Sequence, residues 1–189
     1  MLPGYPSLSH GSRPWRAVSL LPASRPLAGR WQNPVMVSEP KLSQRQDAQA
    51  PRAGEGTRPA QGYAGDVSPQ QACDWWQSGD AVLVDVRTDA EREWVGFVPG
   101  AVGLSWKEWP GMAFNPSFDE ALRAAVPPGK KAVFLCRSGH RSISAAKRGT
   151  ELGIESWNIL EGFEGDRDED GHRGHKGGWR MRGLPWRQN

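Results

Sequence analysis

Long apolar runs and cysteines are both scarce in this chain of 189 residues. No apolar run approaches the roughly 18 residues that a membrane span requires, so we expect no membrane-spanning segment. The sequence contains two cysteines, Cys73 and Cys136. Such sparse use of cysteine is typical of proteins in a reducing compartment, and it predicts a cytoplasmic location.

The first 65 residues contain no isoleucine, hold nine of the 16 prolines and show no sustained apolar periodicity. Such a segment cannot bury enough apolar surface to offset the entropy that it would lose on ordering. We therefore predict that residues 1–65 form a disordered, basic, proline-rich segment. The length that remains suits one domain, which we predict over residues 66–189.

Acidic residues are also unevenly distributed along the chain. Residues 1–65 carry eight Lys/Arg and three Asp/Glu, a balance of +5. Residues 66–189 carry 16 and 18, a balance of −2, and the two balances add to the net charge of +3. The basic pI of 9.1 is therefore a property of the N-terminal segment, and the domain offers no case for binding nucleic acid.

The start of the chain allows two interpretations. The first acidic residue is Glu39, and the arginines before it are Arg13, Arg16, Arg25 and Arg30. This composition resembles an organellar transit peptide, but five prolines between residues 3 and 26 would break the amphipathic helix that such a signal needs. The alternative is that the protein starts at Met36 and that the first 35 residues are translated from upstream sequence.

Short apolar runs alternate with helical patterns throughout the predicted domain. Helices are predicted over residues 68–76, 89–94, 117–125 and 142–152, and strands over residues 81–86, 101–104, 132–135 and 155–160. Ser68 and Thr88 are the expected caps of the first two helices, and Glu91 completes a capping box with Thr88. Trp106, Trp109 and Met112 are expected in a loop. The alternation predicts a single α/β domain with a central, mainly parallel sheet flanked by helices.

Cys136 occupies the most informative position in the sequence, between a buried strand and a helix. A tight loop from strand to helix directs backbone N–H groups and the positive helix end at one point, which here is the cysteine sulfur. The loop also carries Arg137, Arg141 and His140, and such surroundings favour the nucleophilic thiolate. The alternative is a structural cysteine at the end of a core strand.

Four stretches of the chain together resemble the rhodanese-type sulfurtransferases. Residues 136–142 are similar to the family's active-site loop, and Val82-Leu-Val-Asp-Val-Arg-Thr88, with Glu91, is similar to its strand ending in Asp-Val-Arg. Gly96-Phe-Val-Pro-Gly-Ala101 resembles its Gly-His-Ile-Pro-Gly-Ala turn, and Gly177-Gly-Trp179 with Gly183-Leu-Pro185 resembles its C-terminal signature. Two positions differ: Phe97 stands where the family usually has His, and His140 stands where the loop often has Asn.

The resemblance implies a rhodanese-like fold and a specific reaction at Cys136. The thiolate would take the outer sulfur of an anionic donor such as thiosulfate, hold it as a persulfide, and pass it to cyanide or a cellular thiol. Backbone amides of the loop would stabilise the anionic sulfur, and Arg137 and Arg141 would attract the donor. The implied substrate-binding residues are Arg137, Ser138, Gly139, His140 and Arg141. No cofactor and no metal are implied.

Two other functions remain open. One is a persulfide carrier or protein-binding module with a dedicated partner. The presence of Cys136 counts against a non-catalytic module, but a persulfide carrier would show the same sequence features. A cysteine-based phosphatase would carry its arginine at position 142, after five intervening residues, whereas this chain has Ser142 there and the arginine at position 141. The loop is therefore one residue short for phosphate.

The region after the last predicted strand is densely charged. Asp166, Asp168, Asp170 and Gly171 match the start of an EF-hand calcium loop, but position 12 is Gly177 rather than Glu. Two histidines are too few for a structural zinc site. We expect a solvated loop. The alternative is that this loop forms a rim of the site and contacts a partner protein.

Overall fold

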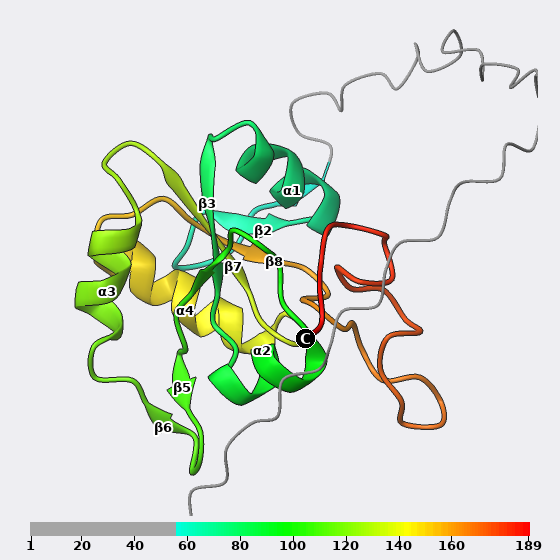
Figure 1. Ribbon diagram of the computed structural model, residues 1–189. Helices are drawn as coiled ribbons and strands as arrows, with labels where there is room; N and C mark the ends of the chain where they lie inside the picture. The colour runs from blue at the N-terminus through cyan, green and yellow to red at the C-terminus, as the bar shows by residue number, and fades with distance from the viewer. Residues whose placement is uncertain (1–55) are drawn as a thin grey trace, which may run out of the picture. The chain divides into compact units, whose positions relative to one another are not determined.

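A computed structural model describes residues 56–189 of the chain (Figure 1). A six-stranded sheet forms its centre, with the strand order β1-β2-β8-β7-β3-β4. The pairs from β2 to β4 are all parallel, and β1 joins the edge in the antiparallel direction. The strands are β1 (Thr57–Arg58), β2 (Gly65–Val67), β3 (Ala81–Asp85), β4 (Val102–Gly103), β7 (Lys131–Leu135) and β8 (Ser156–Ile159). The predicted mainly parallel α/β architecture is confirmed.

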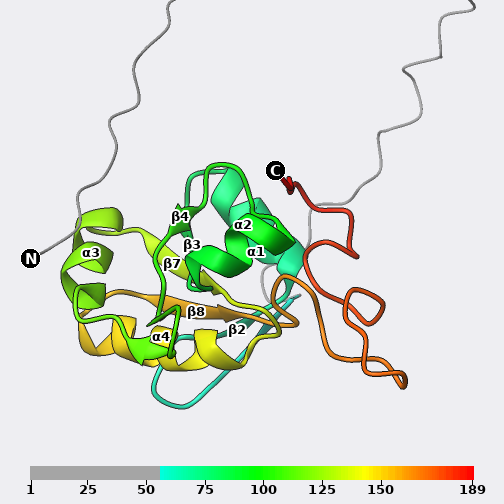
Figure 2. The same cartoon turned by 60° about the horizontal axis from the view of Figure 1, so that its bottom comes forward.

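Helices cover both faces of this sheet (Figure 2). They are α1 (Pro69–Gln77), α2 (Asp89–Val95), α3 (Phe118–Ala125) and α4 (His140–Glu151). Ser68 caps α1, and Thr88 forms the predicted capping box with Glu91 at the start of α2. Both local predictions are confirmed. A cap joins a side-chain oxygen to a backbone N–H three residues later, so it does not depend on the rest of the fold.

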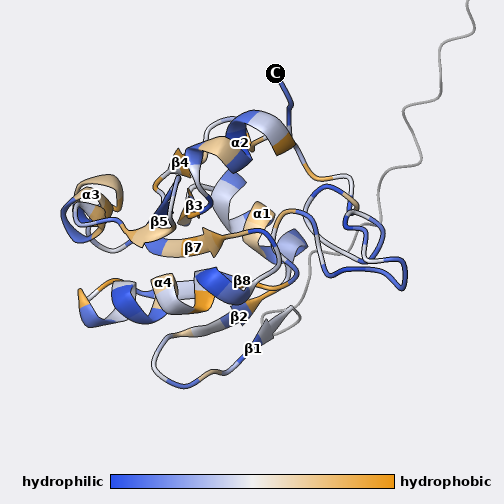
Figure 3. Cartoon of the chain, turned by 90° about the horizontal axis from the view of Figure 1, so that it is seen from below, coloured by the Kyte–Doolittle hydropathy of each residue, from blue (hydrophilic) through white to orange (hydrophobic). Residues whose placement is uncertain are grey.

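The core is divided into two apolar clusters. One contains Cys73 of α1 with Leu83 and Val133 of the central strands, and it extends to Trp179 in the C-terminal segment. The other contains the buried apolar side chains of α3 and α4, and it includes Cys136. Figure 3 shows β7 coloured as hydrophobic between α4 and the helices of the opposite face, as expected for a strand buried on both faces. Side chains of β7 pack into both clusters, and this packing fixes the position of the carboxyl end of β7.

The ordered sheet begins earlier than the predicted boundary at residue 66. Thr57 and Arg58 pair with Val67 and Asp66, and the Ser68 N–H donates to the Gly56 carbonyl at 2.6 Å. A two-residue polar edge strand has no apolar pattern, so nothing in the sequence marks it as a strand. The rest of the predicted N-terminal segment, including the candidate transit peptide and Met36, lies outside the described residues.

A second, two-stranded sheet occupies the region that was predicted to be a loop. Strands β5 (Lys107–Glu108) and β6 (Ala113–Phe114) pair in the antiparallel direction, with Trp109 and Met112 at the connecting turn. Each strand is two residues long, which is too short to show an alternating pattern. Within the described part of the chain, no helix is long and apolar enough to cross a membrane.

Candidate active site

Cys136 follows the last residue of β7 at the carboxyl end of the parallel sheet, and it is 1% exposed. Its Sγ atom accepts a hydrogen bond from the Gly139 backbone N–H at 3.2 Å, and it also lies 3.2 Å from the Ser142 hydroxyl oxygen. Gly139 adopts a left-handed conformation (φ 88°) and is the N-cap residue of α4, so the chain reverses tightly around the sulfur. The sulfur therefore lies at the positive end of a twelve-residue helix.

A turn after β8 holds the outer side of the Cys136 loop, which we define as residues 136–141. The Phe163 N–H donates to the Cys136 carbonyl at 2.8 Å, and the Glu164 N–H donates to the Arg137 carbonyl at 2.9 Å. Gly162 lies so close beneath the loop that an added Cβ would be 2.5 Å from the Cys136 oxygen. The loop backbone is thus fixed by a segment more than 20 residues further along the chain.

The C-terminal segment supports this turn in its own right. The indole of Trp179 is fully buried, its backbone N–H donates to the Gly162 carbonyl at 2.8 Å, and its Nε1–H donates to the Pro185 carbonyl at 2.8 Å. Glu161 accepts a hydrogen bond from the Gly178 N–H at 2.8 Å. The glycine- and tryptophan-rich pattern near the end of the sequence therefore stabilises the floor beneath the Cys136 loop.

Arg141 does not extend freely from the loop but binds Glu91 of α2 through two hydrogen bonds of 2.8 and 2.6 Å. Burial by itself would raise the pKa of the Glu91 carboxyl, but the hydrogen bonds from Arg141 and Thr88 lower it to about 2. Burial likewise opposes the charge of Arg141, yet the contact with Glu91 leaves the pKa of the guanidinium above its usual value. The positive charge of Arg141 is therefore largely balanced within the protein.

The other predicted site residues differ in their exposure to solvent and in their contacts. The Arg137 side chain is 45% exposed, and its Nε lies 4.0 Å from Glu91. The Ser138 hydroxyl lies 3.3 Å from Nδ1 of the exposed His140. Arg137 therefore carries the charge of the loop that is most available to an anion, while Gly139 contacts the sulfur directly.

A cavity of about 560 Å³ lies beside the loop and is lined by both of its arginines. The apolar part of its wall comes from α2 and from the turn between β5 and β6: Ala90, Val95, Trp109 and Met112. Thr88 and Glu91 complete the lining. With one carboxylate and two guanidiniums, the wall carries a net positive charge over an apolar surface. A cavity of this size and composition suits an organic anion.

A buried ion pair anchors the neighbouring strand. Arg87, fully buried, binds Asp85 through Nε at 2.9 Å and Nη2 at 2.6 Å, and Nη2 also donates to the Gly96 carbonyl at 2.9 Å. Its guanidinium lies 3.8 Å from the centre of the Phe163 ring. Phe97 then pairs with Arg187 through two backbone hydrogen bonds of 2.8 Å. The Asp-Val-Arg pattern thus connects β3 to the turn beneath the Cys136 loop.

The second cysteine lies in a different environment. Cys73 is 3% exposed on α1 and packs in the apolar cluster of the face opposite to that of Cys136. Both cysteines are free thiols. Burial, followed by the charge of Asp74, raises the pKa of the Cys73 thiol, which disfavours its thiolate. Cys73 is therefore a residue of the apolar core.

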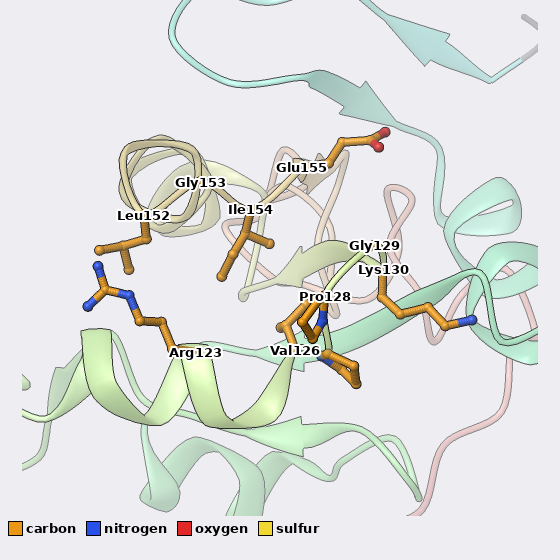
Figure 4. Close-up of a pocket in the computed structure, with 10 residues that line it drawn as sticks. Arg123, Val126, Pro128, Gly129, Lys130, Leu152, Gly153, Ile154 and Glu155 are labelled. Carbon is orange, nitrogen blue, oxygen red and sulfur yellow. The ribbon is translucent and has the colours of Figure 1, made fainter.

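A further cavity of about 440 Å³ lies at the opposite end of the sheet (Figure 4). Its lining includes Lys130, which precedes β7, and Glu155, which precedes β8, whereas Cys136 follows β7. Leu152 and Ile154 supply apolar surface. This cavity belongs to the amino ends of the strands and not to the sulfur site.

The loop over residues 164–176, hereafter the charged loop, is shown mostly in hydrophilic blue in Figure 3. Asp168 organises it: Oδ1 accepts from the N–H groups of Asp170 and His172, and Oδ2 lies 2.6 Å from Nδ1 of His175. Ligand-type atoms of Asp168, Asp170 and His172 lie within 4.8 Å of one another. Both oxygens of Asp168 are nevertheless already engaged by the loop itself, as expected for a solvated loop.

Four residues at the site were not assigned to it from the sequence: Glu91, Ser142, Asn158 and Gly162. The sequence places Glu91 in the capping box and beside the Asp-Val-Arg stretch, and the same carboxylate binds Arg141. Ser142 directly follows the loop and carries a hydroxyl, so its contact with the sulfur had a local signal. Asn158 of β8 has its Oδ1 2.6 Å from the Ser142 hydroxyl, and Gly162 lies in the turn after β8. No sequence pattern links either residue to Cys136.

Comparisons with known proteins agree with this geometry. A family model described as "Rhodanese-like domain" matches residues 68–168. The crystal structure of Rv0390 from M. tuberculosis is 46% identical, with 67% of this chain and 99% of that chain covered and a TM-score of 0.61. The uncharacterized protein RC0915 of Rickettsia conorii is 35% identical over 130 residues, which are 64% of this chain and 94% of that protein. A Rhodopseudomonas palustris protein of unknown function, described as a possible tyrosine phosphatase, is 27% identical; the match covers 65% of this chain and 83% of that chain, with a TM-score of 0.44.

Proposed function

Because this chain belongs to the family of rhodanese-like domains, we propose that it is a sulfurtransferase whose nucleophile is Cys136. The observation that carries the proposal is the position of Sγ, between the end of β7 and the start of α4, where the Gly139 N–H donates to it and the Ser142 hydroxyl lies within reach at 3.2 Å. Hydrogen-bond donors and a helix N-terminus both stabilise an anionic sulfur more than a neutral one. This environment supports a thiolate and, after transfer, a persulfide anion.

The reaction proceeds in two displacements. The Cys136 thiolate attacks the outer sulfur of the donor, the S–S bond of the donor breaks, and sulfite leaves with the electron pair when thiosulfate is the donor. The acceptor then attacks the outer sulfur of the Cys136 persulfide. For cyanide, thiocyanate is released and the thiolate of Cys136 is restored.

The cavity beside the loop is the proposed binding site for the donor. Arg137 supplies the exposed positive charge, and Trp109 and Met112 supply apolar surface for an organic group. The space exceeds what a thiosulfate ion fills, so the proposal extends to organic donors such as thiosulfonates and persulfides. Arg141 holds Glu91 and thereby maintains the shape of the cavity wall.

The alternative proposal is a persulfide carrier that serves one acceptor protein. Trp94 and Trp109 are both exposed, and tryptophan is enriched in protein–protein interfaces, which supports this alternative. A carrier forms the same Cys136 persulfide but transfers its sulfur slowly to small acceptors. The two proposals therefore differ in the second displacement.

Mass spectrometry after treatment with thiosulfate tests the proposal. We expect one added sulfur atom on the peptide that contains Cys136, and none in the Cys136→Ser variant. Cys73→Ser is the matched control and should retain the added sulfur. Release of the sulfur by cyanide indicates an enzyme, whereas retention until a protein acceptor is added indicates a carrier. Lack of any added sulfur on wild-type Cys136 would overturn both.

A further inference from the structure

The hydroxyl of Ser142 lies between two acceptors. Its Oγ is 3.2 Å from the Cys136 Sγ and 2.6 Å from Oδ1 of Asn158. Ser142 is fully buried, and Cys136 and Asn158 are 1% and 2% exposed. A hydroxyl has one proton to donate, so it cannot serve both acceptors at once. Because all three residues are buried, neighbouring protein groups determine which of the two acceptors receives the proton.

Asp66 determines which end of the Asn158 amide faces Ser142. Asn158 Nδ2 donates to Asp66 Oδ1 at 2.8 Å, and the Tyr63 hydroxyl donates to the same oxygen at 2.8 Å. A carboxylate only accepts hydrogen bonds, so the NH₂ group of Asn158 must face Asp66 and its oxygen must face Ser142. Burial and the contact with Asp66 raise the pKa of Tyr63 to about 12, so Tyr63 remains a donor at neutral pH.

Charged groups around the sulfur act in addition to this arrangement. The sulfur and Arg141 attract one another, and this attraction contributes to the raised pKa of Arg141. The titratable and charged groups that face the Cys136 loop from the surrounding elements include Tyr63, Asp66, Asp85, Arg87, Glu91, Arg137, His140, Arg141, Glu161 and Glu164. Ser142 and Asn158 are both uncharged, so their effect depends on the direction of one hydrogen bond.

We propose that Asn158, held in place by Asp66, is a positioning residue that competes with the Cys136 sulfur for the proton of Ser142. While that proton bonds to Asn158, the sulfur faces an oxygen lone pair, which suits a thiol whose S–H can donate. When the thiol loses its proton to solvent, the Ser142 hydroxyl turns to the thiolate and Asn158 loses its bond. Asn158 thus opposes formation of the thiolate, whereas Ser142 assists it.

The inference rests on the proposed function, because it concerns the proposed nucleophile, but its test does not require sulfur transfer. Ultraviolet absorbance of the thiolate is recorded against pH, and the signal of Cys136→Ser is subtracted. We expect Asn158→Leu to lower the midpoint by roughly 0.7 pH unit, the equivalent of one neutral hydrogen bond. Ser142→Ala should raise the midpoint, and Ser142→Thr, which keeps a hydroxyl, should bring it back toward the wild-type value.

The midpoint should fall in Asn158→Leu and rise in Ser142→Ala. A purely structural role of Asn158 would not produce these opposite shifts. An unchanged or higher midpoint in Asn158→Leu would overturn the inference. If Asn158→Leu does not fold, Asn158→Val also lacks the acceptor and suits a strand, so its midpoint decides the question. Thiosulfate treatment of the same wild-type sample tests sulfur transfer separately. A shifted midpoint without an added sulfur would uphold the inference while the proposed function failed.

Discussion

The Cys136 loop and the charged loop follow neighbouring parallel strands, β7 and β8, and leave the same end of the sheet. Both are polar and rich in charge. They differ in where their partners lie. The Cys136 loop is bound by distant segments: Arg141 pairs with Glu91, which lies 50 residues earlier in the sequence, and the Cys136 carbonyl accepts from Phe163. Its geometry is therefore set by the whole domain.

The charged loop is stabilised mainly from within. Asp168 pairs with His175, Glu169 lies 3.7 Å from Lys176, and Asp166 forms an isolated bridge with Lys176. Charge density therefore does not identify a reactive site. A site requires groups that the fold fixes around one atom, and such fixing comes from contacts between segments that are far apart in the sequence.

The largest expected effect comes from an added methyl group beneath the Cys136 loop. Gly162 (φ 61°) and Gly171 (φ 84°) both have positive φ, so alanine strains the backbone at either position. At Gly162 the Cβ also meets the Cys136 carbonyl at 2.5 Å, whereas at Gly171 it meets nothing within 4 Å. We expect Gly171→Ala to lower the unfolding free energy by about 1–2 kcal/mol, and Gly162→Ala by a further 1–3 kcal/mol.

Denaturant unfolding measures these losses, and a sulfur-transfer assay shows their consequence. Gly162→Ala should lower kcat/KM at least about tenfold because the loop must shift, while Gly171→Ala should leave kcat/KM unchanged. Equal losses of activity in the two variants would mean that the Cys136 loop does not depend on the turn beneath it.

Next in size is the loss of the ion pair between Glu91 and Arg141. The pKa of Glu91 lies at about 2, below its usual value of 4.5. A lowered pKa in the folded protein adds stability that is complete above pH 4.5 and disappears as the pH falls toward 2. At neutral pH we expect Glu91→Gln to cost about 1–3 kcal/mol, because a partly buried Arg141 loses its charged partner.

The pH dependence of unfolding separates this ion pair from those of the charged loop. The difference in stability between wild type and Glu91→Gln should close between pH 4.5 and about 2. Asp168→Asn removes a carboxylate from the charged loop, where His175 binds it at the protein surface, and it should cost much less. A cost for Asp168→Asn as large as that for Glu91→Gln would contradict the contrast between the loops.

A smaller effect is expected at the cavity that the Cys136 loop borders. Trp109 lines it, whereas Trp94, 77% exposed, does not. With an aryl thiosulfonate as donor, we expect Trp109→Ala to lower kcat/KM about three- to tenfold, and we expect little change with thiosulfate. Trp94→Ala is the matched control and should affect neither donor. Equal losses for the two donors in Trp109→Ala would show that the organic group does not bind in this cavity.

Local signals were sufficient to predict much of the fold. The apolar runs of β3, β7 and β8 and the caps Ser68 and Thr88 lie within a few residues of the features they determine, so the sequence alone places them. The strands β1, β2, β5 and β6 were not predicted, because each has only two or three residues and owes its position to its partner strand.

The candidate site divides in the same way. Cys136, Gly139 and Ser142 fall within one loop and the first turn of one helix, and the sequence marks that stretch. Gly162 and Asn158 reach the site through the parallel pairing of β7 with β8, which no local pattern encodes. The direction of the Arg141 side chain depended likewise on the position of α2, which supplies Glu91.

The smallest expected effect concerns the free charge of the Cys136 loop. Arg137 is 45% exposed, so water and salt screen its attraction for an anionic donor. We expect Arg137→Ala to lower kcat/KM for thiosulfate only about two- to fivefold at low salt, with little effect on a neutral trisulfide, and the loss should shrink as salt is added. Arg167→Ala removes an exposed positive charge from the charged loop and should change neither rate.

Arg141→Ala should instead reduce the rates with both donors alike at every salt concentration. The charge of Arg141 is balanced by Glu91, so its role is to maintain the shape of the cavity wall. If Arg141→Ala rather than Arg137→Ala showed the salt-dependent loss, the charge that attracts the donor would be the one paired with Glu91.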